Sequence, residues 1–384
     1  MRREMTERDL EELYLFAVPI RRKLHQYPEV GFDLERTVKL VTSKLQELGI
    51  EHTTGYGKGS VVAEIGLGEE ILAIRADLDA LPVEEKVDLP YRSCIPGQMH
   101  DCGHDAHTAV LLAVAKYLKK HESELTRRVR LIFQPSEEGA VSGAKMLVDS
   151  GVMDGVKEII CTHCDNTFGV GEIGTHSGDY MAACIPMTVR FLGRTSHATL
   201  PEQGIDAIAM AHEAYTKLKV MVAKEAGDRQ YIWSVGRFSG GSVHNVIADR
   251  CEMDISFRFY DEGFARRVMK QAEQICAEIA EKFGGKSELL WHISTGAVYN
   301  DPSMVESFEQ VIKETAAARL IRVPGLMSSE DFGWYLVKAP GMIFRFGTRN
   351  EKNSCTTVAH RNDFCIDEEG MKAPIRAFIA YSMR

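Results

Sequence analysis

The sequence predicts an α/β protein with a mostly parallel sheet, helices on both faces of that sheet, and a smaller inserted domain. Two observations predict the sheet: strand-like and helix-like segments alternate in the first half of the chain, and polar residues follow several strands. A third observation predicts the insertion. After about Tyr180 the order changes to strand, helix, two strands, helix and strand, and the first pattern resumes at Thr295. We expect residues 1–183 and 294–384 to form one domain and residues 184–293 to form the other.

The first domain should begin with two helices, because residues 7–25 and 34–48 carry apolar side chains at helical spacing. Residues 60–65 and 70–76 are strand-like. The second of these strands contains Ile71–Ile74, a continuous apolar run typical of a strand covered on both faces. The next expected elements are a helix to about residue 120, a strand at 129–133, a helix at 143–150 and a strand at 158–161.

In the inserted domain, alternating apolar residues indicate strands and a 3.6-residue period indicates helices. The expected strands are 186–191, 231–235, 251–259 and 289–293, and the expected helices are 205–223 and 263–283. The first domain then resumes with a helix at 303–318, a strand at 342–346 and a last helix after Asp367.

The composition excludes several classes of protein. The chain has 384 residues with a net charge of -9, and it contains no long block of Lys or Arg. We therefore expect neither nucleic acid nor an anionic membrane surface as its main partner. The longest apolar run, Ala109–Ala115, is too short to span a bilayer, and the charged N-terminus does not resemble a signal peptide. Nine scattered cysteines, an odd number, indicate reduced thiols and a cytoplasmic protein.

The stretch Met99–His107 is the strongest chemical signal. It holds one thiol, three imidazoles and two carboxylates directly before an apolar helix. Cys102 and His104 flank Gly103, so a tight turn can direct both side chains to one point. Thiolate and imidazole are ligands that zinc and related metals prefer, which favours a metal site. The competing interpretation is a polar helix cap that happens to contain histidines.

A second signal is the pair Glu137–Glu138, which follows the strand at 129–133. One carboxylate can bind a metal while the other acts as a general base, although a solvated acidic turn is the alternative. Asp77 and His163 also fall near the ends of expected strands. Because the carboxyl ends of parallel strands meet at one edge of a sheet, we expect these residues to converge.

Other candidates are weaker when taken alone. His163 lies between Cys161 and Cys164, but a redox pair or zinc knuckle is disfavoured because Cys161 continues an apolar strand. For four further residues, the sequence pattern alone does not distinguish a metal or substrate role from a surface or capping role. These are His197, Asn245, Arg258 and His360.

Taken together, these motifs resemble the aminoacylase and carboxypeptidase family of dinuclear metallohydrolases. The sequence is most similar to the amidohydrolase branch: hippurate hydrolases, auxin-conjugate (IAA-amino acid) hydrolases and N-acetyldiaminopimelate deacetylases. The resemblance covers nearly the whole chain. It is carried by residues 75–82, 102–107, 134–139, 197–198, 245–247 and 328–332 and by His360.

The resemblance implies a zinc-exopeptidase-like catalytic domain and an inserted ferredoxin-like domain that serves as a lid and forms a homodimer. It also implies two divalent metal ions, Mn²⁺ or Zn²⁺, with Co²⁺ or Ni²⁺ as alternatives. The implied metal ligands are Cys102, His104, Glu138, His163 and His360. The other implied roles are Glu137 as the base that activates water, Asp77 as a carboxylate behind the ligands, His197 as an oxyanion donor to the partner subunit's site, Asn245 as a carbonyl contact and Arg258 as a carboxylate contact.

We therefore expect a metal-dependent amidohydrolase that cleaves N-acyl amino acids or related small conjugates. A dipeptidase or aminopeptidase of the same fold is the alternative, which is disfavoured by Cys102 as a ligand and by Arg75, where such enzymes carry a histidine. A non-catalytic metal-binding assembly protein is a further alternative, but Glu137 and all the ligand positions are present. The chain departs from the family pattern at Asp101, Glu202, Ala248 and Asp165–Phe168, which leaves the choice of substrate open.

Overall fold

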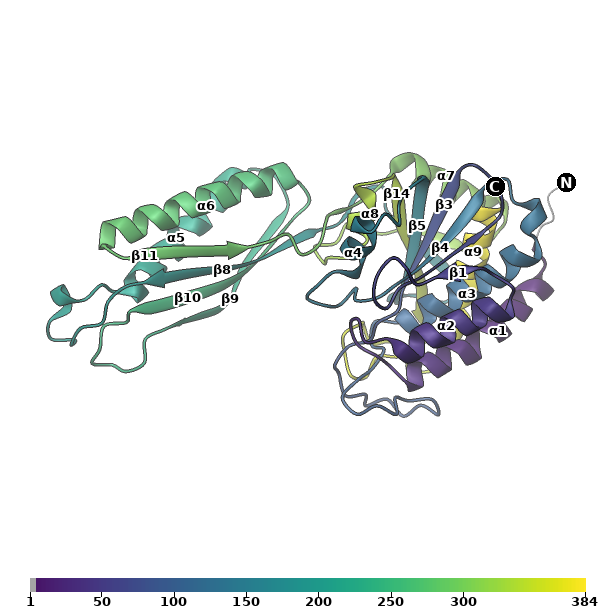
Figure 1. Ribbon diagram of the computed structural model, residues 1–384, viewed down its shortest axis with the longest axis horizontal. Coiled ribbons are helices and arrows are strands. Elements are labelled where there is room, and N and C mark those ends of the chain that lie inside the picture. The colour runs from purple at the N-terminus through teal and green to yellow at the C-terminus, as the bar shows by residue number, and fades with distance from the viewer. Residues whose placement is uncertain (1–4) are drawn as a thin grey trace. The chain divides into compact units, whose positions relative to one another are not determined.

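The computed structural model describes residues 5–384, and these form two compact units (Figure 1). The first unit comprises the chain up to Tyr180 together with Tyr299–Gly325 and Asp331–Arg384. The second comprises Met181–Val298 and Leu326–Glu330. Each unit has a hydrophobic core of its own. The second unit extends a few residues beyond the expected range at both ends and includes a short later segment.

An eight-stranded sheet forms the centre of the first unit, in the order β1-β2-β4-β3-β5-β14-β6-β13. Its strands are β1 (His52–Thr53), β2 (Val61–Ile65), β3 (Ile71–Asp77), β4 (Arg128–Gln134), β5 (Val156–Gly169), β6 (Glu172–Thr175), β13 (Arg319–Arg322) and β14 (Gly341–Arg349). The pairs β4–β3, β3–β5, β5–β14 and β6–β13 are parallel, whereas β1–β2, β2–β4 and β14–β6 are antiparallel. The prediction of a mostly parallel sheet is confirmed.

The helices of this unit form two groups. In the first, α1, α2, α3, α7 and α9 contact one another, and in the second α4 contacts α8 (Figure 1). Their bounds are α1 (Glu7–Gln26), α2 (Glu35–Glu47), α3 (His104–Lys120), α4 (Gly143–Asp149), α7 (Pro302–Glu314), α8 (Gly333–Leu336) and α9 (Lys372–Ser382), with 3₁₀ turns at Glu122–Glu124 and Glu368–Met371. Nearly all of α3 is buried, which explains why this helix is apolar on all sides and has no polar face. Within residues 5–384, no helix combines the length and the apolar character needed to cross a membrane.

The second unit has the order β-α-β-β-α-β, as expected. Its elements are β8 (Ala183–Leu192), α5 (Ala207–Ala226), β9 (Tyr231–Gly240), β10 (Arg250–Phe259), α6 (Glu262–Phe283) and β11 (Lys286–Trp291), with a 3₁₀ turn at Pro201–Gln203. The four strands form an antiparallel sheet in the order β11-β8-β10-β9, and α5 packs against α6. Alternate residues of β8 and β10 are buried, because one face of the sheet packs under the two helices.

Two expectations about individual elements were wrong. The strand expected to end at Cys161 continues to Gly169, because β14 pairs with β5 along almost this whole length, so His163 lies inside the strand. The helix expected at 303–318 ends at Glu314 and is followed by β13. The short strands β6 and β13 were missed, as were β7 (Gly178–Met181) and β12 (Val298–Asn300), which pair with each other. Strands of three or four residues are too short to show a period.

Candidate metal centre

The candidate centre begins at the turn before α3. Gly103 has a φ of 82°, which favours glycine, and a Cβ there would lie 2.3 Å from the Cys164 sulfur. Glycine is therefore required both for the backbone conformation and for the close approach of β5. The turn brings Cys102 and the first helical residue, His104, to the same place, as the sequence predicted.

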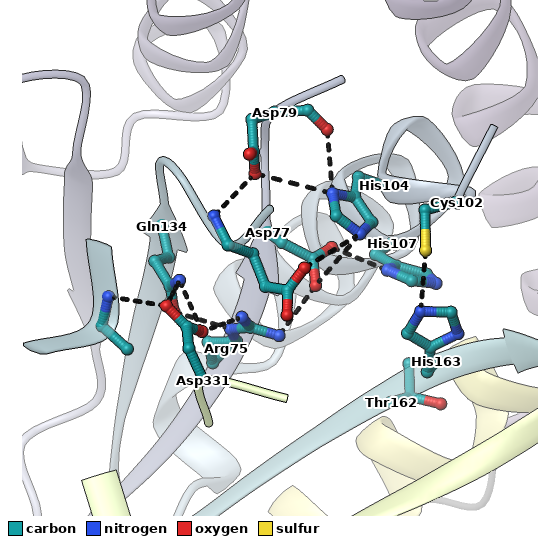
Figure 2. A network of polar contacts seen from close by, with 12 residues as sticks. Arg75, Asp77, Asp79, Cys102, His104, His107, Gln134, Thr162, His163 and Asp331 are labelled. Atoms are coloured by element: carbon teal, nitrogen blue, oxygen red, sulfur yellow. Dashed lines mark hydrogen bonds and ion pairs between the residues drawn. The ribbon is translucent and has the colours of Figure 1, made fainter. Parts of the chain in front are cut away.

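The structure brings the five expected metal ligands and Glu137 together. Ligand-type atoms lie within 4.8 Å of one another in three overlapping groups: Cys102–His104–His163, Cys102–Glu138–His360 and His104–Glu137–Glu138. Figure 2 shows the Cys102 sulfur facing the His163 ring, and its distance to Nε2 is 3.3 Å. Residues from the start of α3, the loop after β4, the middle of β5 and the loop after β14 thus converge on one site.

Hydrogen bonds fix which nitrogen of each histidine faces the cluster. The Nδ1 atom of His104 donates to the carbonyl oxygen of Asp79 at 2.8 Å, and that of His163 donates to its neighbour's carbonyl at 2.7 Å. Both rings therefore present Nε2 to the cluster, the arrangement in which a backbone acceptor orients a metal-binding imidazole. His360 Nε2 lies 2.8 Å from a carboxylate oxygen of Glu138.

Asp79 positions the two glutamates. Its two carboxylate oxygens accept hydrogen bonds from the backbone N–H groups of Glu137 and Glu138, at 3.0 and 3.1 Å. Its own carbonyl accepts the bond from His104, so one residue links the helix start with the Glu–Glu turn (Figure 2). This role of Asp79 was not predicted, although its sequence signal is a second aspartate two residues beyond Asp77, just after a buried strand.

Asp77 is held by two neighbours. His107 Nδ1 donates to one carboxylate oxygen at 2.7 Å, and Arg75 Nη1 donates to the other at 2.7 Å (Figure 2). His107 Nε2 accepts the backbone N–H of Cys164 at 2.9 Å, so both of its ring nitrogens are engaged and it supports the site without binding a metal. Burial alone would raise the pKa of Asp77. The positive charges of His104 and Arg75, together with the hydrogen bond from His107, outweigh burial and hold this pKa well below its usual value.

The donor set fits a divalent cation. His104 Nε2 is buried and has no hydrogen-bond partner among residues 5–384, although it faces carboxylates of Asp77 and Glu137 at 3.8 and 3.9 Å. Burial and the charge of Glu138 raise the pKa of the Cys102 thiol well above its usual value. Burial lowers the pKa of His163, which keeps that imidazole neutral as metal binding requires. The neighbouring carboxylates outweigh burial and raise the pKa of His104 to about 10, so a proton there occupies the place that a metal would take. A buried thiol, three imidazoles and several carboxylates form a donor set that suits a divalent metal.

This arrangement can support hydrolysis. A divalent cation held there would polarise a carbonyl group and lower the pKa of a water molecule. The side chain of Glu137 is 11% exposed, so it lies at the accessible edge of the buried cluster. From there its carboxylate can accept a proton from water and return it to a leaving nitrogen.

Asn166 lies in the segment that departs from the family pattern, and it holds the loop that carries His360. Its Nδ2 donates to the carbonyl oxygens of Thr357 and Cys365, both at 2.7 Å. The backbone N–H of His360 donates to the carbonyl of Asp101 at 2.9 Å, which fixes the loop from the other side. Neither contact was predicted, because both join segments far apart in the sequence.

In the second unit, His197 and Asn245 lie next to each other. His197 forms an isolated antiparallel bridge with Val246, and the N–H of Ala198 donates to the carbonyl of Asn245 at 3.0 Å. The Nδ1 atom of His197 accepts from the hydroxyl and the N–H of Thr199, at 2.8 and 3.3 Å. Its Nε2 therefore carries the proton, and this exposed ring can donate a hydrogen bond.

Arg258 lies away from these two residues. On β10 it pairs with Cys184, whereas Arg250 at the other end of the strand pairs with Leu192. Eight residue steps separate Arg250 from Arg258, about 26 Å in a strand, and Asn245 precedes Arg250. The Nη1 atom of Arg258 donates to the carbonyl of Met327 at 3.2 Å and to the hydroxyl of Ser329 at 3.0 Å. One small substrate therefore cannot contact Asn245 and Arg258 of the same chain.

Comparison with known proteins now identifies the family. Residues 73–384, most of the chain, match the sequence pattern of Peptidase family M20/M25/M40. The chain belongs to this family. The predicted resemblance is thereby confirmed.

Individual M20 relatives agree with this assignment. Thermostable carboxypeptidase 1 of Saccharolobus solfataricus is 32% identical, with 96% of this chain and 95% of the relative aligned. N-acetyl-L-cysteine deacetylase of Bacillus subtilis is 34% identical, with 96% of this chain and 88% of the relative aligned. The structure of the Bacillus subtilis YXEP protein, a dinuclear metal-binding peptidase from the M20 family, is 30% identical, has a TM-score of 0.84 and covers 97% of this chain and 98% of its own. The prediction of a dinuclear metal-dependent hydrolase of amide bonds is confirmed at this level.

Proposed function

We propose that this M20-family chain hydrolyses N-acyl amino acids or closely related conjugates, with two divalent metal ions held by Cys102, His104, Glu138, His163 and His360. The observation that carries the proposal is the convergence of these side chains, together with Glu137, on one buried cluster. The name of one relative, N-acetyl-L-cysteine deacetylase, describes an N-acyl amino acid as substrate. We further propose Mn²⁺ or Zn²⁺ as the native metals and the cytoplasm as the location, since all nine cysteines are free thiols.

The direct test is a screen of N-acyl amino acids with protein reconstituted with Mn²⁺, Zn²⁺, Co²⁺ or Ni²⁺. We expect measurable turnover of at least one such substrate, and chelation should remove it. Full turnover by protein that elemental analysis shows to be free of metal would contradict the proposal.

Cys102→Ala tests the ligand assignment. We expect metal affinity to fall by at least about tenfold, because even residues that only orient metal ligands commonly contribute ten- to hundredfold. Metal content per chain after dialysis against a buffered metal solution is the measurement. Cys276→Ala, which removes another buried thiol in the second unit, is the matched control and should keep normal metal content.

Arg258→Ala tests how the substrate carboxylate is bound. A guanidinium group pairs well with a carboxylate, and losing one charged hydrogen-bond partner costs about 1.5–3 kcal/mol, roughly ten- to hundredfold. We expect such a loss in kcat/KM for an N-acyl amino acid and a much smaller loss for the matching N-acyl amino acid amide. Equal losses on both substrates would show that Arg258 acts only through Met327 and Ser329, its present partners.

We also propose that the active enzyme is a homodimer in which His197 and Asn245 of one chain serve the metal centre of the other. The separation of Asn245 from Arg258 along one sheet supports this, because two chains can supply both groups to one substrate. In this role the exposed Nε2–H of His197 would stabilise the negative oxygen that develops on the attacked carbonyl.

Mixed dimers test this proposal. Glu137→Gln and His197→Ala chains, each inactive alone, should regain part of the activity when they exchange subunits, since one site of each mixed dimer then has both intact residues. Verified mixed dimers without recovered activity would assign His197 to the centre of its own chain.

A further inference from the structure

Two buried thiols lie side by side in the loop after β14. The sulfur atoms of Cys355 and Cys365 are 2.7 Å apart, and each residue is only 4% exposed. The other sulfur hydrogen bonds in the described part of the chain span 3.3 to 3.9 Å. The distance between the two sulfur atoms is therefore shorter than any of these sulfur hydrogen bonds.

The backbone holds both cysteines in place. Asn350 and Cys355 exchange two backbone hydrogen bonds of 2.9 Å across a tight turn. On the other side, Asn166 fixes the carbonyl oxygens of Thr357 and Cys365, both at 2.7 Å. The approach of the two sulfur atoms is thus built into the loop from two independent anchors.

We propose that Cys355 and Cys365 are a site of reversible oxidation, at which hydrogen peroxide joins the two sulfur atoms into a disulfide. The bond would close residues 355–365 into a ring that contains His360. The proposal goes beyond the hydrolytic function and does not depend on the metal role assigned to His360.

The chemistry balances with peroxide as the oxidant. One thiol loses its proton and attacks a peroxide oxygen. The O–O bond breaks, which leaves a sulfenic acid and water once the proton is taken up. The second thiol attacks the sulfenic sulfur, the S–S bond forms, the S–O bond breaks and a second water leaves. Two thiols thereby lose two electrons and two protons, one peroxide becomes two waters, and a thiol reductant reverses the change.

The disulfide should restrict opening of the loop. A cross-link removes conformational freedom from the opened state, so the closed state becomes more favoured. His360 has a positive φ of 64° and Ser354 has one of 58°. Non-glycine residues adopt this left-handed backbone conformation only where the surrounding structure holds them in it. Oxidation would hold the two ends of this loop together.

The full-length, zinc-loaded protein allows a direct test, because zinc does not itself react with peroxide by electron transfer. Trypsin cuts after Lys352, Arg361 and Lys372, so a disulfide joins peptides 353–361 and 362–372. After peroxide treatment and thiol blocking, mass spectrometry should find this linked pair in most chains, and dithiothreitol should remove it.

The chain supplies its own controls. Cys94 is exposed and reports that peroxide has reacted. Cys276 is buried, and among the sulfur contacts of residues 5–384 only the Cys355–Cys365 contact joins two thiols, so Cys276 should stay reduced. Cys276→Ser should still give the linked peptides, and Cys355→Ser should not. If Cys94 is oxidised while Cys355 and Cys365 stay unlinked in the wild-type protein, the proposal is wrong, whatever the variants do.

Amide hydrogen exchange provides the second readout. We expect exchange at residues 356–364 to become about tenfold slower or more in the oxidised protein, since the cross-link disfavours the open loop. A linked protein with unchanged exchange would refute the claim that the disulfide restrains this loop.

Discussion

Glu137→Gln should lower kcat by roughly two to four orders of magnitude, the range expected for losing a general base. The amide cannot accept the proton that the carboxylate takes from water, while its size and its backbone contact with Asp79 are unchanged. Metal content should therefore stay normal. Steady-state kinetics and elemental analysis of the same preparation are the measurements.

Glu138→Gln is the matched control, because it makes the same chemical change one residue along the same turn. Glu138 lies with Cys102 and His360 in one ligand-type group, so we expect this variant to lose metal affinity first. Added metal should restore part of its activity and should not rescue Glu137→Gln. Near-normal turnover in Glu137→Gln would mean that another group is the base.

Asp331→Ala should give the largest loss of stability. The buried Asp331 carboxylate accepts hydrogen bonds from four groups and lies 2.9 Å from the guanidinium of Arg75 (Figure 2). The other three donors are the Gln134 amide at 2.9 and 3.0 Å, the Ser142 hydroxyl at 2.7 Å and the Ala144 N–H at 3.1 Å. Removing one partner of a buried ion pair typically costs about 3–5 kcal/mol. Arg75 keeps its contact with Asp77 in this variant, but the Gln134 amide, the Ser142 hydroxyl and the Ala144 N–H all lose their acceptor on Asp331.

For a unit of this size the loss corresponds to a fall in the melting temperature of about 10 °C, measurable by calorimetry. Asp149→Ala is the matched control. Asp149 forms an exposed ion pair with Lys145 at the end of α4, in the same unit, and such pairs contribute roughly 0–1 kcal/mol. Equal shifts in the two variants would show that the Asp331 network is not a main stabilising feature.

The sequence predicted the parts of this protein that depend on local pattern. The apolar run of β3, the turn at Gly103 and the order β-α-β-β-α-β are each encoded within a few residues, and the structure contains all three. The Met99–His107 stretch pointed to the metal-type cluster for the same reason, since Cys102 and His104, two of the cluster's members, are separated by one residue in the chain.

Contacts between distant segments were not predictable in this way. Asp79 binds the backbone of Glu137, and Asn166 binds the loop that carries His360. Both contacts join segments that become neighbours only after the sheet has formed. The length of β5 was missed because its continuation beyond Cys161 depends on pairing with β14, which lies about 180 residues later in the sequence. The separation of Asn245 from Arg258 likewise follows from strand register, which spacing along the chain cannot reveal.

The central position of β14 in the sheet also determines the order in which parts of this protein can fold during synthesis on the ribosome. β14 lies between β5 and β6, yet Gly341–Arg349 is synthesised after the whole of the second unit. The second unit is nearly contiguous and can fold as it emerges, whereas β5 must wait with one edge unpaired. Such an edge is a template for pairing with other chains, so nascent chains that stall before residue 341 should be aggregation-prone and should engage chaperones through β5. His360 arrives later still, so the candidate metal centre is among the last features to be completed.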